Sequence, residues 1–91
     1  EPQQAVQSAD RCIDVARKSG DTWLLAVMMM RRALIHHLLG DFASAQRDYE
    51  DAVPQLRTMG EWWFLSLALE GMAANALAVG QPESAVAYAR E

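Results

Sequence analysis

The chain has 91 residues, of which 52% are hydrophobic and 22% charged, which excludes a disordered tail and fits one small folded domain. Its formal net charge is −4 and its eight lysines and arginines are scattered, which argues against nucleic acid as a direct partner. Cys12 is the only cysteine, which excludes an intrachain disulfide and fits a cytoplasmic location, and no apolar run reaches the roughly 20 residues that cross a membrane.

Five helices are expected along the chain, separated by glycines that recur every 20 residues from Gly20 to Gly80. Glycine is the preferred residue just after a helix end, where the backbone turns left-handed. No segment shows the alternation of a strand. We expect helices near residues 2–18, 22–39, 42–58, 62–79 and 82–91. Residues 1–91 are thus expected to form one all-helical segment, and the missing initiator methionine suggests a larger parent protein.

The helix starts carry capping signals. Asp21 and Asp41 can accept hydrogen bonds from free N–H groups at the start of the next helix, and Glu61 adds negative charge at a third start. Pro54 lies well inside the third expected helix, where proline removes a backbone hydrogen bond. Either this helix kinks at Pro54 or it ends near Val53, and the apolar face that continues to Met59 favours a kink.

Sliding the chain by 40 residues shows an internal repeat. "SGDTWLLA" (19–26) lies over "MGEWWFLS" (59–66), and "GDFASA" (40–45) lies over "GQPESA" (80–85). The matched positions hold glycines at joints, small alanines and a tryptophan at one helix start. The expected helices 22–39 and 62–79 are apolar almost all round, which predicts that both are covered on every side.

The sequence resembles tetratricopeptide repeats. The resemblance lies in Ala33 and Ala73, the turn "GDF" (40–42) and the second-helix residues Ala45, Tyr49 and Ala52. It implies antiparallel helix pairs that stack as a right-handed α-solenoid. The period of about 40 residues departs from the common 34, and the usual proline that closes the second helix is missing.

A 40-residue variant with "GDTW", "GEWW" and "LALEGMAANALAVG" is similar to the helical-repeat regions of MalT-like, LuxR-type and AfsR-type bacterial transcriptional regulators. This resemblance implies a non-enzymatic region that binds a protein segment, a peptide or an effector, or other domains of the same chain. The alternative is a structural spacer without a ligand of its own. Exposed repeat ends would also favour homo-oligomers.

The resemblance further implies a concave groove lined by the first helix of each pair. The basic and asparagine residues that clamp a peptide carboxylate in some members are missing, so an apolar groove is expected. Its residues would be Val27, Met30, Leu34, His37, Leu67, Glu70, Ala74 and Leu77.

The adjacent histidines His36 and His37 first suggest chemistry, but adjacent helical residues point about 100° apart and cannot both face one metal ion. The repeat aligns them with Ala76 and Leu77, which indicates that both are packing positions. For His37, the alternative interpretation is a contact with a partner in the groove. No GxxxxGK[ST], GxGxxG, CxxC or HExxH motif occurs. We therefore expect no enzyme activity, metal or cofactor; an enzyme domain is an alternative supported by the histidines alone.

Two apolar groups also have alternative interpretations. The methionines at 28–30 could form an adaptable binding surface, but core filling is the favoured interpretation. Trp23 and Trp63 share a register position, which favours a structural role for both. Trp62 aligns with Thr22 and is expected to be an exposed aromatic residue.

Overall fold

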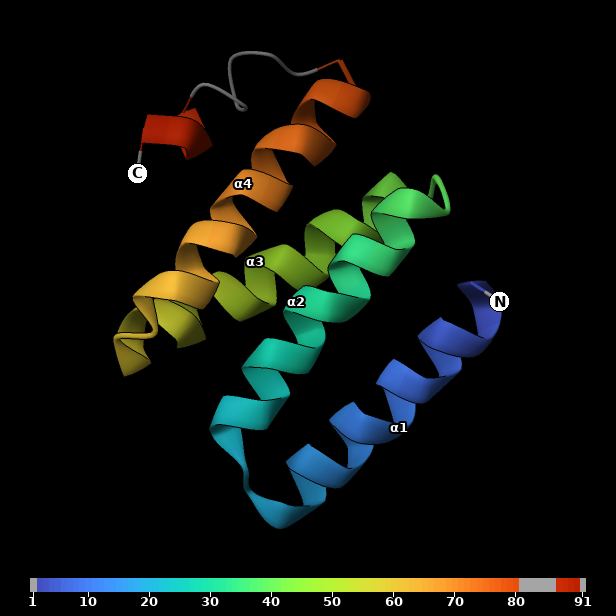
Figure 1. The fold of residues 1–91 in the computed structure, drawn as a ribbon, viewed down its shortest axis with the longest axis vertical. Helices are drawn as coiled ribbons and strands as arrows, with labels where there is room; N and C mark the ends of the chain where they lie inside the picture. Colours follow the sequence, from blue (N-terminus) through green and yellow to red (C-terminus); the bar gives the residue numbers. More distant parts are fainter. Residues whose placement is uncertain (1, 81–86, 91) are drawn as a thin grey trace.

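The computed structural model describes residues 2–80 and 87–90, and this part of the chain is helical with no strand. Figure 1 shows the helices α1 (Pro2–Ser19), α2 (Thr22–Leu38), α3 (Phe42–Met59) and α4 (Trp62–Ala78). Their ends lie within one residue of the bounds expected from the sequence. Residues 87–90 are also helical, and the rest of the expected helix 82–91 lies outside the described residues.

Residues close to each helix end determine where the helix begins and ends, as the sequence predicts. The carboxylate of Asp21 accepts a hydrogen bond from the Leu24 N–H at 3.0 Å, and that of Asp41 accepts one from the Ser44 N–H at 3.2 Å. Glu61 makes no side-chain cap bond. Gly60 has φ of 69° and ends α3 in the left-handed conformation, which is costly for residues with a Cβ.

Helix α3 continues through Pro54 to Met59 without a break. The alternative in which this helix ends near Val53 is therefore wrong. Two side chains bond to carbonyl groups one turn earlier around the proline: the Gln55 amide donates to the Asp51 oxygen at 3.0 Å, and the Thr58 hydroxyl donates to the Pro54 oxygen at 2.9 Å.

Helix α2 is the centre of the arrangement (Figure 1). Among α1 to α4, it contacts the other three helices, whereas α1 contacts α2 alone. Helix α4 contacts α3 and α2. The molecule is flat, with principal extents of 38 × 32 × 16 Å, so most helices keep one uncovered side.

The core lies where α2, α3 and α4 meet, and its most buried members include small residues that allow close approach of the backbones. Ala26, Ala33, Ala45, Ala52 and Ala68 are each 0% exposed. Met29 is buried, and Met28 and Met30 are half-buried and pack against the core, in agreement with core filling.

The expectation that the second and fourth helices are covered on every side is wrong. Large apolar side chains are exposed on both, for example Leu38 at 75% and Leu77 at 61%. Besides α2 and α3, the described residues place only the short helical segment 87–90 beside α4, and it leaves Leu77 exposed.

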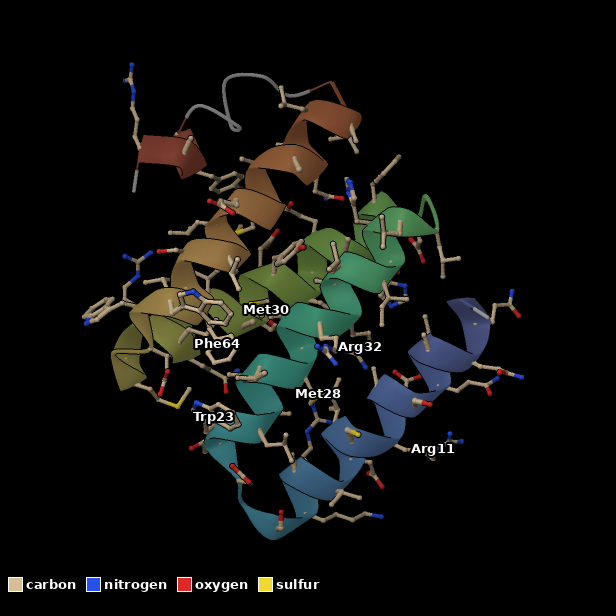
Figure 2. All side chains as sticks on the ribbon, viewed as in Figure 1. Arg11, Trp23, Met28, Met30, Arg32 and Phe64 are labelled. Carbon is tan, nitrogen blue, oxygen red and sulfur yellow. The ribbon has the colours of Figure 1, made fainter. Side chains whose placement is uncertain are left out.

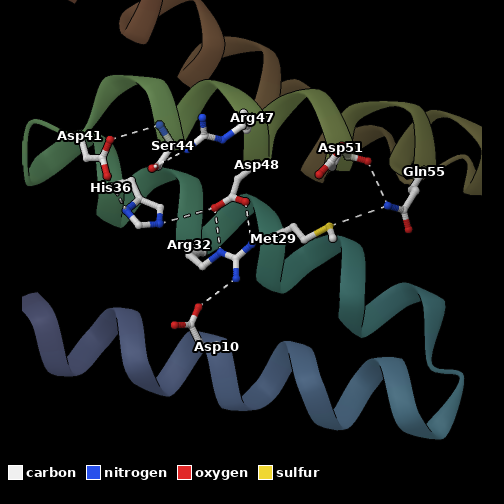
Figure 3. Close-up of polar contacts among 10 residues, drawn as sticks. All are labelled: Asp10, Met29, Arg32, His36, Asp41, Ser44, Arg47, Asp48, Asp51 and Gln55. Carbon is white, nitrogen blue, oxygen red and sulfur yellow. Dashed lines mark hydrogen bonds and ion pairs between the residues drawn. The ribbon is translucent and has the colours of Figure 1, made fainter.

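A polar network joins α1, α2 and α3 (Figure 3). The Arg32 guanidinium donates two hydrogen bonds to the Asp48 carboxylate, at 2.8 and 2.7 Å, and a third to Asp10 at 2.9 Å. Asp48 is 6% exposed, so its charge depends on this bidentate pairing. Hydrogen bonding to Asp48 raises the pKa of Arg32, against the lowering effect of burial.

Candidate binding groove

A groove of about 460 Å³ runs between α2 and α4. Its volume lies in the range of ligand sites, which is about 300–1,000 Å³. Residues of α2 form one wall, residues of α4 form the other, and one residue of α3 reaches the floor. The lining residues are Met30, Arg31, Leu34, Tyr49, Trp63, Phe64, Leu67, Glu70 and Gly71.

Tyr49 and Gly71 form the floor together. Tyr49 is 2% exposed, and its hydroxyl lies directly against the α-carbon side of Gly71. A Cβ at position 71 would overlap the tyrosine hydroxyl and ring, so the absence of a side chain in the middle of α4 makes room for Tyr49. Burial raises the pKa of this phenol further above physiological pH, so the hydroxyl is neutral and can donate a hydrogen bond.

The Tyr49 hydroxyl makes no hydrogen bond within the described residues. In the same part of the chain, no fully enclosed side-chain nitrogen or oxygen lacks a partner. The hydroxyl oxygen must therefore touch solvent, and Tyr49 lines the groove. A polar atom at the floor of an apolar groove has a desolvation cost that an occupant can offset by supplying an acceptor.

Aromatic rings form the end of the groove where α2 and α4 begin. The Phe64 ring makes edge contacts with Trp63 at a centroid distance of 4.9 Å and with Trp23 at 5.7 Å. Figure 2 shows Trp23 and Phe64 beside each other at the starts of the two helices. Trp63 is 68% exposed, so this wall presents an uncovered aromatic face.

Opposite charges stand on the two helices that border the groove. Arg31 of α2 and Glu70 of α4 are both exposed, and both line the groove. Neither has an ion-pair partner among the described residues. The rim therefore offers one cation and one anion that have no ion-pair partner in the part of the chain that the structure describes.

Half of the groove residues expected from the sequence are brought together here. Met30, Leu34, Leu67 and Glu70 line the groove. Val27, His37, Ala74 and Leu77 do not line it. Val27 is half-buried, whereas Ala74 and Leu77 are exposed farther along the helices.

His37 packs at the other end of the α2–α4 contact. Its Nδ1 lies 2.9 Å from Oδ1 of Asn75, and its ring lies 5.3 Å from that of Phe42. Asn75 is 1% exposed and also donates to the Phe42 carbonyl at 3.0 Å. His37 therefore joins a buried polar contact between α2, α3 and α4.

The expected exposed aromatic, Trp62, is 65% exposed but does not line the groove. Trp63, for which the repeat favoured a structural role, is equally open and does line it. Sequence reasoning missed Arg31, Tyr49, Phe64 and Gly71 as well. Gly71 offered a signal, because a glycine inside a helix is costly and usually allows a close approach.

His36 lies beside two carboxylates, with ring nitrogens 3.8 Å from Asp41 and 3.8 Å from Asp48 (Figure 3). Hydrogen bonding to Ser44 lowers the pKa of Asp41, as expected of a helix cap. Across residues 2–80 and 87–90, no group of three or more histidine, cysteine, aspartate or glutamate side chains is arranged to hold a metal ion. The same residues contain no helix long and apolar enough to cross a membrane.

Comparison of the chain with protein-family models, with curated proteins and with solved structures finds no match in any of the three.

Proposed function

We propose that this chain is a non-enzymatic helical-repeat segment that binds an apolar peptide or protein segment in the groove between α2 and α4. The observation that carries this proposal is the combination of apolar walls with one unpartnered hydroxyl, that of Tyr49, at the floor. Binding sites of this kind pair a largely apolar lining with a few polar groups that set orientation.

The occupant's chemistry follows from the lining. Leu34 and Leu67 offer aliphatic contacts, and Trp63 offers an aromatic face, so the occupant should carry apolar side chains. The Tyr49 hydroxyl needs an acceptor, which each peptide unit supplies as a carbonyl oxygen. Arg31 and Glu70 would select acidic and basic groups on the two sides of the occupant.

The 40-residue repeat and the right-handed solenoid belong to this proposal. The equal spacing of the joints supports the repeat, because Gly20, Gly40, Gly60 and Gly80 all have positive φ after the ends of α1, α2, α3 and α4.

The pattern of contacts supports stacking as well. Helix α2 contacts the helix before it, the helix after it and the next helix but one. In a solenoid each repeat contacts its neighbours in this way. We further propose, from the resemblance alone, that the segment is the interaction or sensor region of a bacterial transcriptional regulator in the cytoplasm.

A peptide-display selection on the immobilised full chain tests groove binding. Leu34→Asp places a charge in the groove and should weaken a selected peptide about 10-fold or more, since a buried unpaired charge is costly. Tyr49→Phe removes only the hydroxyl and should weaken it about 2- to 10-fold, the value of one hydrogen bond. Titration by fluorescence polarisation measures both effects.

Leu38→Asp is the matched control, because Leu38 is on the same helix, 75% exposed and outside the groove. It should leave peptide affinity unchanged. An equal loss for Leu38→Asp and Leu34→Asp would contradict binding in the groove.

The second candidate is a structural spacer, and exposed apolar residues outside the groove favour it. Leu38, Leu39 and Val79 are 75%, 42% and 44% exposed at the ends of α2 and α4, where adjacent repeats could cover them. Failure of the selection to yield any peptide that depends on Leu34 would favour this function.

A further inference from the structure

Equivalent positions of the proposed repeat differ in burial: residues on one side of α1 are exposed, whereas their equivalents on α3 are buried. Ser8 and Cys12 of α1 are exposed, whereas their equivalents on α3, Asp48 and Ala52, are 6% and 0% exposed. Helix α2 covers this face of α3, as the Arg32–Asp48 bonds show. No described helix covers the corresponding face of α1.

Helix α2 shows the same asymmetry on the side that it shares with α1. Met28 and Ile35 are half-buried, whereas their equivalents on α4, Ala68 and Asn75, are 0% and 1% exposed. A cleft of about 320 Å³ lies here between α1 and α2. We call it the front cleft; it is lined by Ala5, Ser8, Ala9, Cys12, Met28, Arg31 and Ile35.

At the α4 end of the molecule, residues of α4 are more exposed than their equivalents on α2. Ala26 and Ala33 of α2 are both 0% exposed and belong to the hydrophobic core. Their equivalents on α4, Ser66 and Ala73, are exposed and half-buried. The outer side of α4 therefore corresponds to the side of α2 that is buried inside the molecule, but it is only partly covered, by the segment of Tyr88 and Ala89 beside Ser66 and Glu70. The front cleft corresponds to the side of α3 and α4 that α2 covers, so a helix like α2 would fit there.

The two charged residues of the rim complete this complementarity. Gly71 lines the groove with Met30 and Leu34. In the 40-residue register, Gly71 is equivalent to Arg31, and Met30 is equivalent to Glu70. If α4 of one copy lay in the front cleft of another as α2 lies on α3, Arg31 would lie beside the other copy's Glu70.

We propose that copies of this chain associate head to tail, with α4 of one copy in the front cleft of the next and an ion pair between Arg31 and Glu70 across the contact. The inference rests on the 40-residue repeat proposed above, but not on the ligand of the groove. The contact is heterologous, since different surfaces meet, so it forms chains or closed rings and not a symmetric pair.

Residues 87–90 set the strength of this association. The register aligns them with residues 7–10 of α1, so α1 of the next copy would take their place. Tyr88 holds this segment through packing on the core and a hydrogen bond from Gln46 at 3.2 Å. The residues 87–90 therefore compete with the next copy, and a weaker Tyr88 contact favours association.

Sedimentation equilibrium of the full chain over a wide concentration range, in reducing buffer, tests the proposal. Arg31→Glu and Glu70→Arg each replace the attraction with repulsion and should weaken association about 10-fold or more. The double variant restores opposite charges and should return to within about 3-fold of the wild type. Tyr88→Ala should strengthen association.

Arg17→Glu and Glu50→Arg are matched controls, because both residues are exposed and line neither the groove nor the front cleft. They should leave association unchanged, and circular dichroism of every variant should show the wild-type helix content. A wild-type chain that stays monomeric at all concentrations overturns the proposal, as does a double variant no stronger than its single variants.

Failure of this proposal is distinguishable from failure of groove binding. Cys12→Glu places a charge in the front cleft and should abolish association while leaving binding of a selected peptide intact. Leu34→Asp should do the opposite. Loss of association without loss of peptide binding thus concerns only the contact between copies, and a chain that associates normally with Cys12→Glu refutes the front cleft.

Discussion

At the scale of single residues, Gly71 is the glycine at which an added Cβ would overlap a neighbouring side chain, that of Tyr49. The aromatic ring crosses from α3 to α4 and ends against a backbone that has no Cβ. Because Tyr49 is 2% exposed, its ring has no open space into which it could move. The groove floor therefore depends on a glycine that is unfavourable for the helix in which it lies.

Gly71→Ala should destabilise the chain by about 2 kcal/mol. Overpacking of a core costs about 1–3 kcal/mol or more, and the better helix propensity of alanine offsets only about 1 kcal/mol. Urea denaturation followed by circular dichroism measures the change in the free energy of unfolding.

The same substitution in a Tyr49→Leu background is the control. The shorter side chain removes the overlap at position 71, so Gly71→Ala should there be neutral or stabilising. An equal cost in both backgrounds would show that the close approach to Tyr49 is not the cause.

At the scale of helices, the Arg32 network connects α1, α2 and α3 through one guanidinium (Figure 3). The bond to Asp48 is largely shielded, with side chains 23% and 8% exposed, whereas Asp10 is 52% exposed. The α2–α3 connection should therefore carry more energy than the α1–α2 connection.

Replacement of Arg32 by methionine, the residue at the equivalent position 72, should destabilise the chain by about 3 kcal/mol, because it leaves the Asp48 carboxylate buried without its main partner. Asp48→Ser introduces the residue found at the equivalent position 8. In a double-mutant cycle measured by urea denaturation, the two changes should couple by at least about 1 kcal/mol.

The exposed pair of Asp14 and Lys18 is a matched control within α1, at 3.0 Å and with side chains 59% and 76% exposed. The corresponding cycle, Asp14→Ser with Lys18→Met, should give a coupling of about 0.5 kcal/mol or less. A coupling for Arg32 and Asp48 as small as that of the control would contradict a shielded pair.

At the scale of the whole molecule, the helices differ in how many neighbours hold them. Helix α1 contacts α2 alone, whereas α2 contacts α1, α3 and α4. Elements with fewer packed contacts open more often than the core, and local opening has a lower free energy than global unfolding.

Native-state amide exchange should therefore show α1 as the least protected of the four helices, with rates about 10-fold or more above those of α3. The buried faces of the two helices give a direct comparison, for example at Ala9 and Ala52, which are 2% and 0% exposed. Equal protection of α1 and α3 would mean that the molecule opens only as one unit.

The sequence by itself determined the helices and their ends. Gly60 ends α3 and Asp41 begins it through interactions with groups three or four residues away, so nearby residues suffice to predict these boundaries. The resemblance to tetratricopeptide repeats also predicted four of the nine residues that line the groove, namely Met30, Leu34, Leu67 and Glu70.

Only the tertiary structure decided which of these residues lie together. Tyr49 meets Gly71, and His37 meets Asn75, across 22 and 38 positions of the chain, and such contacts depend on the angles at which helices cross. Helical spacing is the same along a whole helix, so it cannot separate Leu67, which lines the groove, from Leu77 of the same helix, which is exposed beyond it. The groove exists at the point where α4 approaches α2 over the Tyr49 ring, and packing between helices determines that point.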